Sequence, residues 1–272
     1  MGTLYLVATP IGNLEDITAR ALRILREAAL IAAEDTRHTR RLLTHFAIHT
    51  PLTSYYEHNK LDKLDAVLAA LETGDVALVS DAGTPALSDP GYELVRAALA
   101  AGHAVTPVPG PSAVLAALVA SGLPTDAFVY LGFLPRKDAE RRRLLESVRA
   151  EPRTLVAYEA PHRLLETLAD LRAVLGDRPA AVARELTKLH EEIFRGTLAE
   201  AAAHFAEKEV LGEITLVVAG AAGQPAERWE AARVRAELVR LTAAGLKRKE
   251  AARQLAQLAG WSAREIYNLP AD

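Results

Sequence analysis

Short apolar runs and amphipathic stretches alternate along the first half of the chain. Apolar runs bounded by turn residues indicate buried strands, and stretches with apolar positions three or four apart indicate helices. The predicted strands are 3–8, 30–33, 76–79 and 104–108, and the predicted helices are 17–28, 61–71, 92–101 and 112–119. We expect Asp16 to cap the first helix, because its carboxylate can accept hydrogen bonds from the free N–H groups there.

A second alternating series follows the Gly-Leu-Pro-Thr sequence at 122–125, which is typical of a connection. Its predicted strands are 128–133, 154–158, 180–184 and 214–218, and its predicted helices are 138–149, 162–174 and 198–207. A linker containing Gly and Pro is expected at 219–227, and only helical patterns follow it, at 229–244, 246–256 and 262–268. We expect Ser262 to cap the last helix, and Trp261 and Tyr267 to pack in the core of this tail.

The alternation of strands and helices predicts an α/β fold, because right-handed crossovers build a mainly parallel sheet. A chain of 272 residues exceeds the usual size of one domain. We therefore predict two α/β lobes, 1–121 and 122–222, and a helical tail at 228–272. Ligands are expected at the carboxyl ends of the strands.

Composition excludes several classes of protein. The chain has no cysteine, which rules out disulfides, thiolate metal sites and a cysteine nucleophile. It has no long uncharged apolar stretch, and its first residues lack a basic segment, so neither a membrane span nor a signal peptide is expected. These features together predict a cytoplasmic protein. No cluster of potential ligands suggests a metal.

Charge is unevenly distributed along the chain. The net charge is −3, but residues 228–272 hold nine Lys or Arg against five Asp or Glu and carry +4, which leaves −7 for the rest. A basic tail on an acidic body suggests contact with a polyanion. A solvated helical face is the alternative.

Three turns rich in Gly or Pro follow predicted strands, at 8–14, 80–91 and 109–113. Because the carboxyl ends of parallel strands share one edge of the sheet, the three turns should converge on a preformed ligand site. Asp81 could accept a hydrogen bond there from a ribose hydroxyl or an amine. Neither the Gly-x-Gly-x-x-Gly pattern of dinucleotide sites nor a Walker lysine loop is present, which disfavours dehydrogenases and P-loop proteins.

This set of loops resembles the tetrapyrrole-methylase family, whose fold pairs a mainly parallel sheet lobe with a mixed sheet lobe. The likeness spans residue 3 to about 219, and the motifs fit the branch that methylates 16S ribosomal RNA on a ribose 2′-oxygen. The motifs are VATPIGNLEDI at 7–17, AEDTR at 33–37, SDAGTP at 80–85, PGPSA at 109–113, YEAPHR at 158–163 and RELTK at 184–188. Tetrapyrrole methylases often carry a Gly-rich first loop where this chain has Ala8, Thr9 and Pro10, which weakens a tetrapyrrole substrate.

The resemblance implies an S-adenosylmethionine-dependent methyltransferase acting on a decoding-region cytidine of 16S rRNA, with the assembled small subunit as substrate. It also implies a homodimer. The cofactor is expected between the lobes, held largely by backbone groups. By motif, the cofactor-binding residues are Pro10, Ile11, Asp81, Gly83, Thr84, Pro85, Ser112, Ala113, Tyr158 and Ala183.

Methyl transfer to a hydroxyl needs an aligned acceptor and a group that accepts the proton or stabilises the developing charge. Three polar clusters follow strands and could supply such a group: residues 34–38, the pair Glu159 and His162, and residues 184–188. We hypothesise that Glu34, Arg37 and Glu185 lie nearest the acceptor and that Lys188 stabilises charge. For any single residue, a buried ion pair or a helix cap is the rival explanation.

Two basic segments are candidates for RNA contact. The first contains Arg136, Lys137 and Arg141, followed by two further arginines, and the second contains Lys247, Arg248 and Lys249. The tail resembles a helix-turn-helix that would grip ribosomal RNA, although a small bundle used for dimerisation is the alternative.

Two other functions stay open on sequence alone. The first is a methylase of tetrapyrroles or other small molecules, which the basic tail disfavours. The second is a non-catalytic RNA-binding protein, which the intact cofactor loops disfavour.

Overall fold

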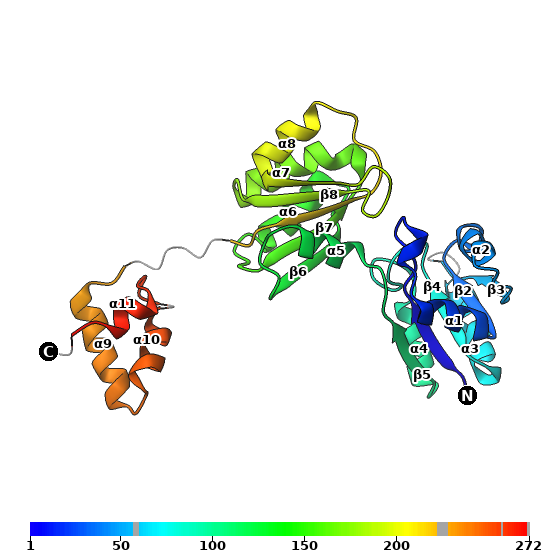
Figure 1. The fold of residues 1–272 in the computed structure, drawn as a ribbon, viewed down its shortest axis with the longest axis horizontal. Coiled ribbons are helices and arrows are strands. Elements are labelled where there is room, and N and C mark those ends of the chain that lie inside the picture. Colours follow the sequence, from blue (N-terminus) through cyan, green and yellow to red (C-terminus); the bar gives the residue numbers. More distant parts are fainter. Residues whose placement is uncertain (57–59, 222–227, 257, 271–272) are drawn as a thin grey trace. The chain divides into compact units, whose positions relative to one another are not determined.

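The computed structural model describes residues 1–56, 60–221, 228–256 and 258–270. The chain divides into two compact units, Met1–Gly220 and Ala221–Asp272, and most of their elements are labelled in Figure 1. The predicted α/β fold class is confirmed: the first unit holds one parallel and one mixed sheet, and the second is helical. Among the described residues, no helix is both long and apolar enough to span a membrane.

The first sheet is wholly parallel, with the strand order β3-β2-β4-β1-β5. Ala77 and Val79 pack on one face of this sheet with α1 and α2, whereas Val76 and Leu78 pack on the other with α3 and α4. Its strands are β1 (Thr3–Val7), β2 (Leu30–Ala33), β3 (Leu52–Ser54), β4 (Val76–Val79) and β5 (Ala104–Val108), and the helices are α1 (Ala19–Glu27), α2 (Thr36–His45), α3 (Lys60–Thr73) and α4 (Tyr92–Ala100).

The second sheet is mixed, with the order β6-β7-β10-β8-β9, in which only β6 and β7 pair in parallel. Helices α6, α7 and α8 supply the apolar side chains that cover one face. The strands are β6 (Phe128–Phe133), β7 (Thr154–Glu159), β8 (Pro179–Arg184), β9 (Glu192–Thr197) and β10 (Ile214–Val218), and the helices are α6 (Asp138–Ser147), α7 (Leu164–Leu175) and α8 (Leu198–Ala206).

Helix α5 (Ala113–Ala120) joins the two sheets. Its sequence is apolar on all sides, but only Val114, Ala117 and Leu118 are buried, and Leu115 and Val119 are exposed. Val114 and Leu118 pack against Val156 and Val217 of the second sheet, and Ile11 from the first lobe belongs to the same cluster. This shared core sets the carboxyl edge of the first sheet against the second lobe.

Some predicted elements differ from those observed. Helix α1 is capped by Thr18, whose hydroxyl accepts the N–H of Ala21 at 3.0 Å. Asp16 lies instead in a short 3₁₀ helix, Leu14–Asp16, so the predicted cap is wrong. Helix α2 and strands β3 and β9 were not predicted, because α2 is mostly polar and the two strands lie at sheet edges and bury little.

The second unit consists of α9 (Ala231–Ala243), α10 (Arg248–Ala256) and α11 (Ala263–Tyr267). Trp261 packs against their apolar core as predicted, and its indole N–H donates to the Trp229 carbonyl at 2.8 Å. Ser262 caps α11, also as predicted. The expectation for Tyr267 is wrong: its neighbour Ile266 points into the core, and Tyr267 is 49% exposed. Most of the predicted linker, at 222–227, lies outside the described residues.

Candidate active site

Four loops meet at the carboxyl edge of the first sheet, after β1, β2, β4 and β5. The first and third are joined by two backbone hydrogen bonds between Thr9 and Gly83, of 2.9 and 3.0 Å. Gly83, Ala86 and Ser88 have φ values of 80°, 66° and 65°. Left-handed backbone at residues other than Gly is unfavourable and tends to cluster at functional sites. The loop after β4 is therefore held in a specific, strained shape.

A cavity of about 390 Å³ lies between this edge and the second lobe. Seven of the ten predicted cofactor-binding residues line it: Ile11, Asp81, Gly83, Thr84, Ser112, Ala113 and Tyr158. Pro10 lines a neighbouring cavity instead, while Pro85 and Ala183 are buried and line neither. Several further residues that line this cavity were not predicted from the sequence, namely Leu87, Asp89, Phe133, Gly212, Glu213 and Thr215.

Five carboxylates line this first cavity: Glu34, Asp81, Asp89, Glu159 and Glu213. Burial raises the pKa of Asp89 to about 6, an effect that a hydrogen bond from Ser80 opposes and the charge of Asp81 supports. Burial and the charges of Asp89 and Asp81 also raise the pKa of Glu34. Concentrated negative charge of this kind favours a cationic ligand.

Aromatic rings form another part of the wall. Phe133 and Tyr158 both line the cavity, and their ring centroids are 5.2 Å apart. Tyr130 lies edge-on to Tyr158, and its hydroxyl is 2.8 Å from the Ser88 hydroxyl. This bond ties the strained loop after β4 to the second lobe. Phe133 exposes a ring face, which provides a flat apolar surface for a ligand.

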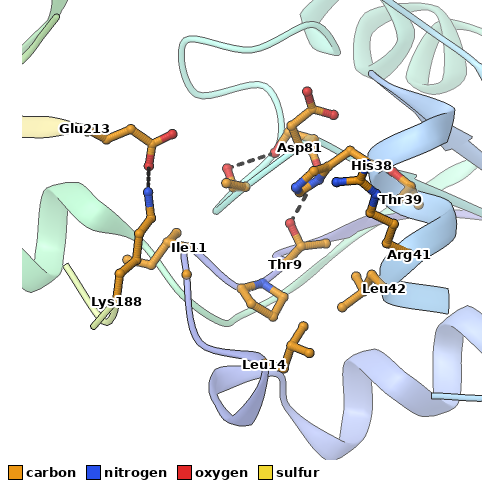
Figure 2. Close-up of a pocket in the computed structure, with 14 residues that line it drawn as sticks. Thr9, Ile11, Leu14, His38, Thr39, Arg41, Leu42, Asp81, Lys188 and Glu213 are labelled. Carbon is orange, nitrogen blue, oxygen red and sulfur yellow. Dashed lines mark hydrogen bonds and ion pairs between the residues drawn. The ribbon is translucent and has the colours of Figure 1, made fainter. Parts of the chain in front are cut away.

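A second cavity, of about 260 Å³, adjoins the first, and the two share Ile11, Asp81, Ala82 and Glu213. Figure 2 shows Lys188 and Glu213 on one side of it, with His38 and Arg41 of α2 on the other. The second cavity therefore has cationic side chains on two sides. The four residues that it shares with the first, acidic cavity form the wall between the two.

Lys188 is held in this second cavity by two carboxylates. Its ammonium nitrogen lies 2.7 Å from Glu185 Oε1 and 3.0 Å from Glu213 Oε2. Burial lowers the pKa of Lys188, but the hydrogen bonds to both carboxylates raise it by more, so the pKa is above its usual value. Lys188 is therefore a permanent cation at neutral pH and cannot serve as a base.

The loop that presents Lys188 is itself strained. Glu185 and Thr187 have φ values of 52° and 68°, in the left-handed region. The Glu185 carboxylate also accepts the N–H of Glu213 at 3.0 Å, so it holds both the ammonium and the backbone in front of β10. Hydrogen bonds to Lys188 and Glu213 outweigh burial and lower the pKa of Glu185. Glu185 therefore positions Lys188 and does not itself line either cavity.

The comparison with known proteins agrees with this geometry. Residues 3–202 match the family described as Tetrapyrrole (Corrin/Porphyrin) Methylases. The chain belongs to the tetrapyrrole-methylase family. Methylases of this family use S-adenosylmethionine, so the chain is an S-adenosylmethionine-dependent methyltransferase.

Several relatives in this family cover nearly the whole chain. A protein of Synechocystis sp., named ribosomal RNA small subunit methyltransferase I, is 52% identical over 99% of this chain and 97% of its own length. One of Halalkalibacterium halodurans with the same name is 50% identical over 98% and 94%. One of Thermotoga maritima, also with that name, is 52% identical over 81% of this chain and 99% of its own length.

Solved structures of other methyltransferases and of diphthine synthase share the fold. Diphthine synthase superposes with a TM-score of 0.62 at 15% identity, over 80% of this chain and 90% of that one. Uroporphyrin-III C-methyltransferase of Thermus thermophilus, complexed with S-adenyl homocysteine, superposes with a TM-score of 0.56 at 23% identity, over 80% and 97%.

The residues present fit the cofactor of a tetrapyrrole methylase. The first cavity falls within the size range of small-molecule sites. Its carboxylates match the positive sulfonium and ammonium groups of S-adenosylmethionine, and the rings of Phe133 and Tyr158 offer apolar contact for its adenosine. Backbone groups of the loops around Gly83 and Ser112 complete the cradle.

The acidic cavity predicts pH-dependent binding of this cofactor. Below about pH 6 Asp89 is protonated and loses the charge that attracts a cation. The affinity for S-adenosylmethionine should therefore fall with pH, by up to about tenfold per unit below 6. S-adenosylhomocysteine lacks the sulfonium charge and should show a weaker dependence. Calorimetric titration of both ligands from pH 5 to pH 8 measures this dependence. In Asp89→Asn, the affinity for S-adenosylmethionine should vary less with pH, and the variation that is left should come from Glu34. An unchanged profile in that variant would show that Asp89 plays no part.

Arg37, a predicted catalytic residue, lies outside both cavities. Its side chain is 87% exposed and forms a bidentate pair with Asp35, with N···O distances of 3.1 and 2.7 Å. On the same helix, His38 and Arg41 line the second cavity. These two residues are three apart and so share one face of a helix, which would have placed them together had α2 been predicted.

The cluster at Glu159 has a structural role. Glu159 is 2% exposed and accepts hydrogen bonds from Arg163, from the Thr167 hydroxyl and from the Ala160 N–H. These bonds fix the turn from β7 into α7. His162 is exposed and lines neither cavity.

The basic segment on α6 is only partly a surface. Arg136 and Lys137 are exposed, but Arg141 is completely buried, so the expectation that it contacts RNA is wrong. Its guanidinium lies 2.6 Å from Asp170 Oδ2 and 2.8 Å from Glu166 Oε1. A buried arginine needs such partners to offset its loss of hydration. In the tail, Lys247 and Lys249 are exposed, whereas Arg248 is half-buried.

Proposed function

We propose that this chain transfers the methyl group of S-adenosylmethionine to the ribose 2′-oxygen of a decoding-region cytidine in 16S rRNA. The observation that carries the proposal is the pair of adjoining cavities, one acidic and one bordered by cations, which meet at Ile11, Asp81 and Glu213. The first holds the cofactor through the seven predicted residues that line it, and Pro10, Pro85 and Ala183 support the surrounding loops and strand. The second receives the nucleotide.

The relatives support an RNA acceptor. Proteins that match almost the whole chain are named for methylation of small-subunit ribosomal RNA. The second cavity, at about 260 Å³, is of the size of one nucleoside, whereas a tetrapyrrole macrocycle is considerably larger. His38 and Arg41 border it and can contact the phosphates on either side of the ribose. Arg136, Lys137, Lys247 and Lys249 are the further proposed contacts to RNA.

Lys188 and Glu34 divide the catalytic work in this proposal. The cofactor supplies an electrophilic methyl group, so the ribose hydroxyl gains the methyl carbon and loses its proton. Lys188 stabilises the negative charge that develops on the ribose oxygen, and Glu34, whose pKa is raised by burial and by the charges of Asp89 and Asp81, accepts the proton. Glu185 positions Lys188, and Arg37 contributes positive charge at the entrance.

The proposal extends to the domain boundaries, the form of the substrate and the oligomeric state. We propose lobes at 1–121 and 122–222 and an RNA-binding tail at 228–272. The substrate is the assembled small subunit in the cytoplasm, and the enzyme acts as a homodimer.

The test is methylation of small ribosomal subunits that lack the modification. Purified protein is incubated with radiolabelled S-adenosylmethionine and such subunits, and the label is mapped by nuclease digestion and mass spectrometry. One 2′-O-methylated cytidine in 16S rRNA is the expected result. Label on a base or on another nucleotide would overturn the acceptor, and binding of the cofactor without any labelled RNA would favour a small-molecule substrate.

A further inference from the structure

The second unit carries a groove of about 380 Å³ between α10 and α11. The groove is lined by Lys249, Arg253, Ala263, Arg264 and Tyr267, so every charged residue in it is basic. Lys249 and Arg253 are four residues apart on α10, and Arg264 and Tyr267 are three apart on α11, so each pair lies on one face of its helix. Within the described parts of the chain, these three cations have no carboxylate partner.

The shape of this groove is fixed by Arg248. Its guanidinium donates hydrogen bonds to the carbonyls of Tyr267, at 3.0 Å, and Leu269, which end α11. The neighbouring residues of the basic segment 247–249 therefore have different roles. Arg248 holds α11 against α10, and Lys249 lines the groove. The ring of Tyr267 is half-exposed at the edge of the groove.

Docking in the manner of a DNA-binding helix-turn-helix does not fit this unit. Such docking points the N-terminal end of the second helix at the nucleic acid. Here that end carries a capping box of Ser262 and Glu265, and Glu265 pairs with Arg228 at 3.0 Å. A carboxylate at this position would repel phosphate. Of the three cations in the groove, Arg264 lies in the first turn of α11 next to this carboxylate, and Lys249 and Arg253 lie on α10.

The relatives indicate that the second unit supplies no group for methyl transfer. The Thermotoga maritima relative bears the same name as the longer ones, yet its match uses 99% of its own length and only 81% of this chain. It therefore has no counterpart of about a fifth of this chain, an extent comparable to that of the second unit.

We infer that the groove binds an unpaired segment of the RNA substrate. Lys249, Arg253 and Arg264 contact successive phosphates, and Tyr267 stacks on a base. A single strand is favoured over a duplex, because only unpaired bases offer a face to an aromatic ring. The groove adds affinity for RNA and leaves the chemical step to the first unit. This inference rests on the proposed RNA substrate.

The experiment uses the full-length protein and a fluorescein-labelled single-stranded RNA, with a duplex of the same sequence for comparison. In the double variant Arg253→Ala/Arg264→Ala, the slope of log affinity against log salt should become less steep by about 1.4, since each phosphate contact on single strands contributes about 0.7. Tyr267→Leu should weaken binding at least about fivefold, and Tyr267→Phe should restore it. Arg172→Ala, at an exposed site on α7, is the matched control and should leave the slope unchanged.

Turnover of small subunits supplies the second measurement. The groove variants should raise KM and leave kcat unchanged, whereas partial misfolding would lower the apparent kcat and leave KM unchanged. An unchanged salt slope in the double variant, or tighter binding of the duplex with no effect of Tyr267→Leu, would overturn the inference. If the wild-type protein methylates no RNA but the variants still bind RNA less tightly, the proposed function fails and the groove stands.

Discussion

Replacement of Lys188 by methionine is expected to lower kcat for methyl transfer by about 10²- to 10³-fold, the usual effect of removing one donor that stabilises a developing anion. Methionine keeps most of the aliphatic stem, which packs closely against Gly12, and removes only the charge. Lys188 lines the second cavity and not the first, so the affinity for S-adenosylmethionine should change by less than about twofold.

The measurement is single-turnover methylation of small subunits at saturating RNA, with cofactor affinity obtained by calorimetry. Lys63→Met is the matched control, because Lys63 lies on α3 and lines neither cavity. A rate for the Lys188 variant within about threefold of the wild type would exclude the proposed role. A parallel loss of cofactor binding would instead mean that Lys188 supports the first cavity.

The pH profile separates charge stabilisation from proton transfer. The net pKa of Lys188 is raised, so the side chain stays protonated throughout the neutral range. The ratio of wild-type to variant rates should therefore be constant between pH 6 and pH 8.5. If Lys188 acted as a base, it would have to lose its proton, and this ratio would rise with pH.

Helices and strands could be predicted from the sequence where the burial of their side chains determines the pattern of apolar and polar residues. Strands β2, β4 and β10 consist almost entirely of buried apolar residues, and their predicted bounds match the structure. Helix α2 buries only Thr39 and Leu43 among its ten residues, so its period is nearly invisible in the sequence. Strand β9 is an edge strand with no fully buried residue, and it therefore lacks the apolar run of a central strand.

The site was predictable where the chain backbone itself forms it. The loops after β1, β4 and β5 are rich in Gly and Pro, and their residues line the first cavity. Cavity-lining residues that come from elements far apart in the sequence could not be predicted in this way. Glu213 reaches both cavities only because β10 inserts between β7 and β8, and that strand order is not encoded in local sequence. Likewise, nothing local distinguishes the buried Arg141 from its exposed neighbours on α6.

The position of Lys188 depends on Gly212, and nothing in the sequence around this glycine indicates that role. Gly212 has φ 90°, and a Cβ added there would lie 2.2 Å from the carboxyl carbon and Oε1 of Glu185. Both atoms belong to the end of a flexible side chain, so Gly212→Ala should be relieved by displacement of the Glu185 carboxylate. That displacement breaks its bonds to the Lys188 ammonium and to the Glu213 N–H.

We expect Gly212→Ala to lower kcat by up to about a hundredfold, because a catalytic group that is misplaced by about an ångström loses most of its effect. Gly176→Ala is the matched control: Gly176 has φ 84°, and a Cβ there would have nothing within 4 Å. Both variants place alanine at a positive φ, so each carries a backbone cost that lowers the free energy of unfolding measured with urea. Only Gly212→Ala should also lose activity. Equal activity in the two variants would mean that Glu185 does not govern Lys188, whereas selective loss in Gly212→Ala would place catalytic control in this contact between two loops of the second lobe.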